Sequence, residues 1–196
     1  MGVEARDPHT IKSRRGSLQL PSIDDALAVT CSDLPSDLPA NAQYLTSSQA
    51  RGIPGLLEWM FQLTKTNMRD MYEACEGWGW HDAAKREELG HDSSRYLVVG
   101  QHAFVHLRYE MEDLQPIIYV YEIQVDAMHR GKQLGRKLME AVEVVSQLLG
   151  FPKVMLTVFS SNIGARKFYQ ALGYENDAST PDGPDAGYFI LSKEIA

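Results

Sequence analysis

One stretch of this 196-residue chain, residues 117–150, constrains the fold more than any other. It opens with IIYVYEIQV, residues 117–125, whose β-branched and aromatic side chains predict a buried strand. After Asp126 the apolar residues recur at helical spacing as far as Leu149. A strand, a basic glycine-containing loop and a helix form a typical anion-binding arrangement, because the helix N-terminus offers unpaired N–H groups and a positive dipole end. The candidate anion-binding residues are Arg130, Gly131, Lys132, Gln133, Leu134, Gly135 and Arg136.

The type of anion is not fixed by this loop alone. Its spacing fits neither the nucleotide-binding pattern GxxxxGK(S/T) nor the dinucleotide-binding pattern GxGxxG. A basic, solvated helix start explains the loop equally well. A second motif is needed to decide between these interpretations.

The distribution of charge favours a basic partner. The net charge is −7, and residues 70–92 hold seven acids and two bases, residues 110–126 five acids and no base, and residues 175–185 four acids and no base. Acidic loops also serve solubility, but three of them beside one basic loop form a bipolar pattern that solubility does not require. We therefore expect a basic partner and no direct binding of nucleic acid. No membrane span is expected, since no apolar run approaches roughly 18 residues.

The composition suits one domain, since 44% of the residues are hydrophobic. We expect a loosely ordered N-terminal arm over residues 1–40, rich in Ser, Pro and Asp, and a single domain over residues 41–196. Cys31 and Cys75 lack metal or redox spacing, which predicts reduced thiols and no metal site. The basic start of the arm suits a nuclear address or a solvated tail, and it lacks the apolar segment of a secretory signal. We expect a monomer located in the nucleus and cytoplasm.

The remaining segments predict an α/β (α+β) fold in which helices flank a mixed, mostly antiparallel sheet. Pro54 introduces a long amphipathic helix that ends near Glu76, and a second helix follows over residues 81–89. The strand at 117–125 and the apolar run 153–159 are joined by a helix, which predicts a parallel crossover. Further strands are predicted over residues 41–48, 96–100, 103–109 and 187–192, the last closing the sheet, and a further helix over residues 162–172.

A carboxylate interrupts the apolar strand at 117–125. Burying Glu122 in the middle of this strand is costly unless the charge is paired or functional, so the residue is a candidate for the site. Strict alternation along the strand predicts Tyr119, Tyr121 and Ile123 on one face and Val120, Glu122 and Gln124 on the other.

Two tryptophans, Trp78 and Trp80, alternate with glycines in the loop between the first two helices. Glycine makes a loop mobile, whereas large aromatic side chains need an apolar surface to cover. Either the indoles pack under the following helix or they wall a binding site.

Two motifs together resemble the GNAT acetyltransferases. Residues 130–135 follow that family's pattern Arg/Gln-x-x-Gly-x-Gly/Ala, with Gln133 in place of the usual glycine. Its N–H suits phosphate binding in right-handed helical geometry but not with a positive φ. Residues 162–174 (NIGARKFYQALGY) resemble the family's second signature. Further blocks are similar to the NatD type, N-terminal acetyltransferases that modify histone tails, namely residues 63–73, 78–80, 85–88, 119–125 and 153–159.

This resemblance implies a GNAT fold whose sheet is splayed at an acetyl-CoA site. It implies direct transfer of acetyl to the α-amine of histone tails that begin Ser-Gly-Arg-Gly. In this family an asparagine reaches the pantetheine arm and a tyrosine lies near the thioester sulfur. The residues expected to bind acetyl-CoA are Ile123, Gln124, Val125, residues 130–136, Asn162 and Tyr169.

Such a transfer needs a base and an acid. An α-amine with a pKa of about 7.7–8.0 costs about 1 kcal/mol to deprotonate at pH 7, whereas a lysine near 10.4 costs about 4.6 kcal/mol, so a modest base is enough for a chain terminus. Our hypothesis is that Glu122 is this base, acting through a water and helped by the hydroxyls of Tyr121 and Tyr72. Tyr169 is the candidate acid for the leaving thiolate, or else an ordinary core aromatic.

Charge also suggests how a basic tail is recognised. Glu110 and Glu112 precede the catalytic strand and suit charge-assisted pairs with the arginine of the tail. A lysine side chain or a small polyamine is the alternative acceptor, and a module that binds CoA or a basic tail without turnover is the non-enzyme alternative. The residues expected to wall a narrow slot for the substrate are Tyr72, Trp78, Tyr119, Tyr121 and Tyr188.

Overall fold

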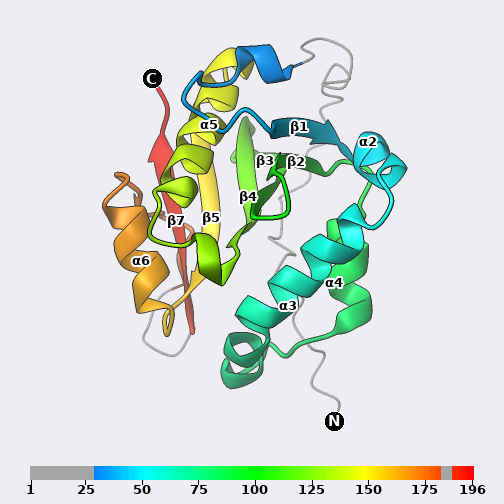
Figure 1. Ribbon diagram of the computed structural model, residues 1–196. Coiled ribbons are helices and arrows are strands. Elements are labelled where there is room, and N and C mark those ends of the chain that lie inside the picture. Colours follow the sequence, from blue (N-terminus) through cyan, green and yellow to red (C-terminus); the bar gives the residue numbers. More distant parts are fainter. Residues whose placement is uncertain (1–28, 182–186) are drawn as a thin grey trace.

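The computed structural model describes residues 29–181 and 187–196, which form a seven-stranded sheet with helices on both faces (Figure 1). The strands are β1 (Ala42–Thr46), β2 (Arg95–Val99), β3 (Ala103–Glu112), β4 (Gln115–Val125), β5 (Lys153–Phe159), β6 (Glu175–Asn176) and β7 (Tyr188–Glu194). The helices are α2 (Ser47–Gly52), α3 (Leu56–Ala74), α4 (Asp82–Leu89), α5 (Leu134–Leu149) and α6 (Ile163–Gln170), with 3₁₀ helices η1 (Cys31–Asp33) and η2 (Ala127–His129). The strand order is β1-β2-β3-β4-β5-β7-β6.

The pairing of the strands confirms the predicted fold class. Neighbouring strands are antiparallel except for β4 and β5, which are parallel and are connected through α5. The ladder between β4 and β5 ends at Val120 and Leu156, although β4 continues to Val125 and β5 to Phe159. The two strands therefore separate at their C-terminal ends, as expected for a splayed sheet.

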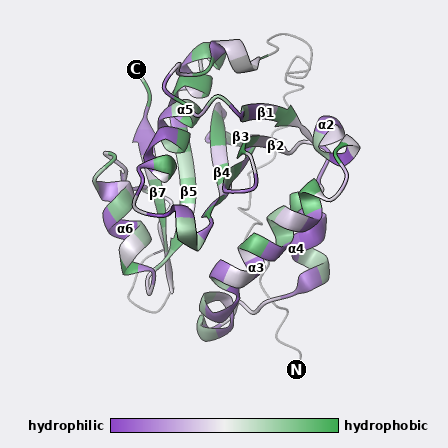
Figure 2. Ribbon diagram, in the orientation of Figure 1, coloured by the Kyte–Doolittle hydropathy of each residue, from purple (hydrophilic) through white to green (hydrophobic). Residues whose placement is uncertain are grey.

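Two apolar cores lie on opposite faces of the sheet. On one face α5 packs Leu138 and Val142 against the central strands, and on the other α3 packs Met60 against the sheet. Neighbouring residues of β2 divide between the cores, Leu97 into the first and Tyr96 into the second, as alternation along a strand requires. Figure 2 shows the central strands β4 and β5 as largely hydrophobic and α4 as largely hydrophilic.

A bulge in β4 corrects the predicted alternation. Glu122 and Val120 lie opposite consecutive residues of β3, so Tyr121 is an extra residue in the ladder. Val120 and Ile123 both pack into the α5 core, whereas residues three apart in a regular strand lie on opposite faces. Tyr121 and Glu122 therefore both point to the face that α3 and α4 cover. The prediction that they point to opposite faces is wrong, because it assumed a regular strand.

Among the α-helices and strands, two were not predicted, α2 and β6. Helix α2 starts at a capping box, in which the Thr46 side chain accepts a bond from the backbone of Gln49 and the Gln49 side chain accepts one from the backbone of Thr46. Strand β6 pairs with β7 and extends the sheet beyond the strand that was expected to close it.

The described part of the expected N-terminal arm lies against the domain. Val29, Leu34 and Leu38 pack against the α5 core, and Lys137 Nζ donates to the carbonyl of Asp37 at 2.6 Å. Residues 1–28, and with them the basic segment considered as a nuclear address, lie outside the described residues. Within residues 29–181 and 187–196, no helix is long and apolar enough to cross a membrane.

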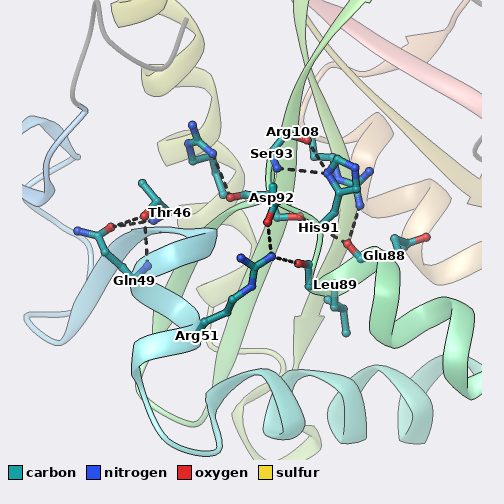
Figure 3. A network of polar contacts seen from close by, with 12 residues as sticks. Thr46, Gln49, Arg51, Glu88, Leu89, His91, Asp92, Ser93 and Arg108 are labelled. Carbon is teal, nitrogen blue, oxygen red and sulfur yellow. Dashed lines mark hydrogen bonds and ion pairs between the residues drawn. The ribbon is translucent and has the colours of Figure 1, made fainter. Parts of the chain in front are cut away.

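A polar network fixes the C-terminal end of α4 (Figure 3). Arg51 of α2 bonds to Asp92 and to the carbonyl of Gly90, and Arg108 Nη2 of β3 donates to the carbonyl of Glu88 at 2.6 Å. These bonds hold α4 beside β3 and β4. The side chain of Lys85 in α4 thereby contacts Glu122 of β4.

Candidate active site

A cavity of about 730 Å³ lies where β4 and β5 separate. Its walls come from β4, β5, the C-terminal half of α3, the basic loop and the first turns of α5 and α6. The predicted site residues that line it are Tyr72, Trp78, Tyr119, Tyr121, Glu122, Ile123, Gln124, Val125, Arg130, Gly131, Gln133, Leu134, Gly135, Arg136, Asn162 and Tyr169. The predicted residues outside this lining are Glu110, Glu112, Lys132 and Tyr188.

The basic loop ends at Gln133, which is the N-cap residue of α5 and has φ 62° and ψ 6°. Gln133 therefore does not have the right-handed helical geometry in which its N–H was expected to suit phosphate binding. A left-handed conformation costs an L-residue about 1–2 kcal/mol. The next residues, Leu134, Gly135 and Arg136, still line the cavity with the first turn of α5, whose N–H groups have no partner within the helix. The loop makes the turn that suits glycine, with glutamine in its place.

We expect Gln133→Gly to stabilise the protein by about 1 kcal/mol, because glycine adopts the left-handed conformation without a clash of its Cβ. Gln133→Ala keeps the Cβ and is expected to change the free energy of unfolding by less than about 0.5 kcal/mol. Urea unfolding of the two variants measures the difference. Equal stability of both variants would show that the loop holds this conformation without strain.

Glu122 is only 5% exposed, and both of its carboxylate oxygens accept hydrogen bonds. Lys85 Nζ of α4 donates to Oε1 at 2.9 Å, and Gln124 Nε2 donates to Oε2 at 2.7 Å. Lys85 is itself 5% exposed and also donates to Glu88 Oε1 at 2.7 Å and to the Tyr72 hydroxyl at 2.9 Å. The burial of Glu122 is thus matched by a buried cation, as a charge in this position requires.

The surroundings of Lys85 and Tyr72 keep both side chains protonated at neutral pH. Burial alone would lower the pKa of Lys85, but Glu122, Tyr72 and Glu88 together hold it well above its usual value, so the side chain is an ammonium. Burial and the charge of Glu122 raise the pKa of the Tyr72 hydroxyl, which stays protonated. A carboxylate has about four lone-pair directions, and two of those on Glu122 remain for a ligand or water in the cavity.

Aromatic side chains wall the cavity on the other side of Glu122. The ring of Trp78 packs edge-on against Tyr72, Phe159 and Tyr188, with centroids 5.7, 4.8 and 5.2 Å away. Trp80 instead packs behind Tyr72 at 5.4 Å and is not among the lining residues. Trp78 thus lines the cavity, whereas the ring contacts of Trp80 are with Tyr72 and Phe61 of α3, the preceding helix.

The two acids proposed for substrate recognition have different surroundings. The Tyr121 hydroxyl donates to Glu110 Oε1 at 3.0 Å, which connects Glu110 to the aromatic wall. Burial and the charge of Glu110 raise the pKa of Tyr121. Glu112 lies further along β3, where burial and the charges of Asp113 and Asp177 raise its pKa. Of these two acids, Glu110 is the one that hydrogen-bonds to a cavity-lining residue within the described part of the chain.

Helix α6 contributes two predicted residues. Asn162 caps the helix, its Oδ1 accepting from the backbone of Ala165 at 3.1 Å. Tyr169 is 6% exposed, and burial together with the charge of Glu122 raises the pKa of its hydroxyl, so that it is protonated at neutral pH. Within the described ranges, no group of His, Cys, Asp and Glu is arranged to hold a metal ion.

Asn67 and Lys85 are among the polar residues at the site that were missed. Asn67 lies four residues before Met71 on the apolar face of α3 and lines the cavity. Lys85 lies four residues before the buried Leu89 on the inner face of α4. A polar side chain at helical spacing from buried apolar residues was the available signal in both cases.

Comparison with known proteins identifies the family. Residues 65–174, more than half of the 196-residue chain, match the family model described as Acetyltransferase (GNAT) family. The chain therefore belongs to the GNAT acetyltransferase family.

Individual relatives agree with this assignment. The chain is 40% identical over 73 residues to N-alpha-acetyltransferase 40 of Saccharomyces cerevisiae, a match that covers 34% of this chain and 26%, about a quarter, of that protein. A GNAT-family acetyltransferase structure from Desulfovibrio desulfuricans covers 79% of this chain and 99% of its own, with a TM-score of 0.60 and 14% identity. The structure of the NatC complex bound to Gag peptide and CoA covers 80% of this chain and 99% of its own, with a TM-score of 0.58 and 11% identity. At these identities the two structures show the fold alone.

Proposed function

We propose that the protein transfers the acetyl group of acetyl-CoA to the N-terminal α-amine of histone tails that begin Ser-Gly-Arg-Gly. The position of Glu122 carries this proposal: it is a buried, ion-paired carboxylate in the wall of a cavity that the basic start of α5 and several aromatic side chains also line. The partial likeness to a yeast N-alpha-acetyltransferase supports an α-amine as acceptor. Such tails occur in the nucleus and cytoplasm, where we place the protein.

The residues of the cavity suit acetyl-CoA as co-substrate. Arg130 and the N–H groups at the start of α5 offer the donors and the positive charge that a diphosphate requires. Beyond Val120 the backbone of β4 is not paired with β5, so Ile123 and Val125 can bond the amide groups of the pantetheine arm. Asn162, the N-cap residue of α6, lines the same cavity.

The reaction needs two proton transfers. As the α-amine nitrogen attacks the thioester carbonyl carbon, Glu122 takes one amine proton through a water held by the Tyr72 and Tyr121 hydroxyls. The new C–N bond forms, the C–S bond breaks, and Tyr169 gives its proton to the leaving thiolate. Return of the proton from Glu122 to Tyr169 through solvent restores both residues. The products are the acetylated peptide and the CoA thiol.

The slot selects the peptide by size and charge. Tyr72, Trp78 and Tyr121 confine the first residues, which favours serine followed by glycine. The arginine at the third position of the tail would form a charge-assisted pair with Glu110, beside the Tyr121 hydroxyl. Glu112, near Asp113 and Asp177, adds negative charge further out.

The test is the release of CoA from acetyl-CoA with two versions of a Ser-Gly-Arg-Gly-Lys peptide, one with a free N-terminus and one blocked there. We expect turnover only with the free terminus, and weaker binding when alanine replaces the arginine of the peptide. Equal turnover of the blocked peptide would move the activity to lysine. Silence with both peptides would contradict peptide acetylation and favour a polyamine or binding alone.

A further inference from the structure

A chain of hydrogen bonds connects the basic loop with Glu122. Arg130 Nη2 donates to Asn67 Oδ1 at 2.6 Å, and Asn67 Nδ2 donates to Gln124 Oε1 at 2.9 Å. Gln124 Nε2 in turn donates to Glu122 Oε2 at 2.7 Å. These four residues, the amide relay, come from the loop, α3 and β4, and all line the cavity.

The two ends of the amide relay fix the direction of every bond in it. Arg130 has only donors, so it requires the oxygen of the Asn67 amide. The ionised Glu122 has only acceptors, so it requires the nitrogen of the Gln124 amide. Between them the Asn67 nitrogen meets the Gln124 oxygen, and no donor faces a donor. The relay therefore suits an arginine at one end and a carboxylate ready to take a proton at the other.

Arg130 is able to bind a diphosphate without leaving the relay. A guanidinium has five N–H donors. In Arg130, Nε donates to the carbonyl of Val125 at 3.2 Å, and one hydrogen on Nη2 is donated to Asn67. Three N–H groups remain for phosphate oxygens. Arg130 is exposed, whereas Gln124 is 4% exposed, so the outer end of the relay is the part that a ligand would immobilise.

We propose that Asn67 is a positioning residue that makes the orientation of Glu122 depend on acetyl-CoA bound at Arg130. Binding of the diphosphate orders Arg130, Arg130 orders the Asn67 amide, and Gln124 then holds Glu122 Oε2 while Lys85 holds Oε1. The base is thereby set in place when the acetyl donor is present. This inference rests on the proposed function, in which Glu122 is the base.

The experiment measures kcat and the KM for acetyl-CoA with the free-terminus peptide in wild type, Asn67→Ala and Asn67→Leu. Both replacements favour a helix, and leucine keeps the branching at Cγ and the number of side-chain heavy atoms of asparagine, which alanine does not. We expect kcat to fall roughly tenfold to a hundredfold, as for a misplaced catalytic group, with the KM for acetyl-CoA changed by less than about threefold. Thr66→Ala, an exposed neighbour on α3, is the matched control and should keep the wild-type kcat.

A double variant separates positioning from a general effect on the fold. In a Glu122→Gln background, Asn67→Ala should lower kcat by less than about twofold, because the group that Asn67 positions no longer acts as a base. A full additional loss in that background, a change in KM alone, or an unchanged kcat in either single variant would overturn the inference. A wild-type protein that fails to acetylate the free terminus would instead overturn the proposed function, and the inference with it.

Discussion

Glu122→Gln is expected to lower kcat by about 10²- to 10⁴-fold, the usual contribution of general acid–base catalysis. The amide keeps the size of the side chain, but it cannot accept the proton of the incoming amine. Its nitrogen would also face either Lys85 Nζ or Gln124 Nε2, which both donate to the carboxylate. Steady-state rates of CoA release with the free-terminus peptide, at saturating acetyl-CoA, measure the loss.

Glu88→Gln is the matched control for this variant. Glu88 also accepts a bond from Lys85 Nζ, at 2.7 Å, but it is not among the residues that line the cavity. The same change of charge beside Lys85 should therefore cost less than about tenfold in kcat. Equal losses in Glu122→Gln and Glu88→Gln would assign the effect to the ion pairs of Lys85 and would remove Glu122 as the base.

Lys85→Met is expected to lower the free energy of unfolding by about 3–5 kcal/mol, because it leaves buried carboxylates without their cation. Lys85 contacts Glu122 at 2.9 Å and Glu88 at 2.7 Å, and the side chains of all three are at most 10% exposed. Urea unfolding followed by circular dichroism measures the loss. The double variant Lys85→Met/Glu122→Gln should recover part of it, since one of the unpaired charges is then absent.

Lys65→Met provides the comparison at the surface. Lys65 forms an ion pair with Asp82 at 2.7 Å, the same distance as between Lys85 and Glu88, but the side chains of Lys65 and Asp82 are 28% and 48% exposed. Water screens such a pair, so its loss should cost much less than the loss of the buried pairs of Lys85. If Lys85→Met costs no more than Lys65→Met, the buried cluster is not what stabilises α4 against β4.

The sequence predicted the framework of the fold because its elements are long and strongly patterned. Helix α3 begins after Pro54 and ends before Gly77, and β5 occupies the predicted range 153–159. The short elements α2 and β6 were missed, although the capping box at Thr46 is visible in the sequence. Helix α2 has only six residues, so its apolar pattern is too short to indicate a helix directly after the predicted strand.

The site residues that lie within one segment of the sequence were predicted, whereas several that come from other helices were not. The basic loop and Glu122 lie within residues 117–150, and the structure places them around one cavity. The partners Asn67 and Lys85 come from α3 and α4, and no local pattern states which strand those helices cover. The bulge at Tyr121 depends on pairing with β3, which periodicity within β4 does not contain.

The raised pKa of Lys85 has a consequence for the enzyme itself. Lys85 Nζ lies 2.9 Å from the carboxylate proposed to receive the proton of the substrate amine, and an uncharged lysine nitrogen would be a competing nucleophile for the proposed acetyl donor. Its buried anionic neighbours keep the nitrogen protonated and without a free lone pair. In the proposed mechanism Lys85 is thus no acceptor for the acetyl group, by the same difference in proton affinity that separates a chain terminus from a lysine side chain.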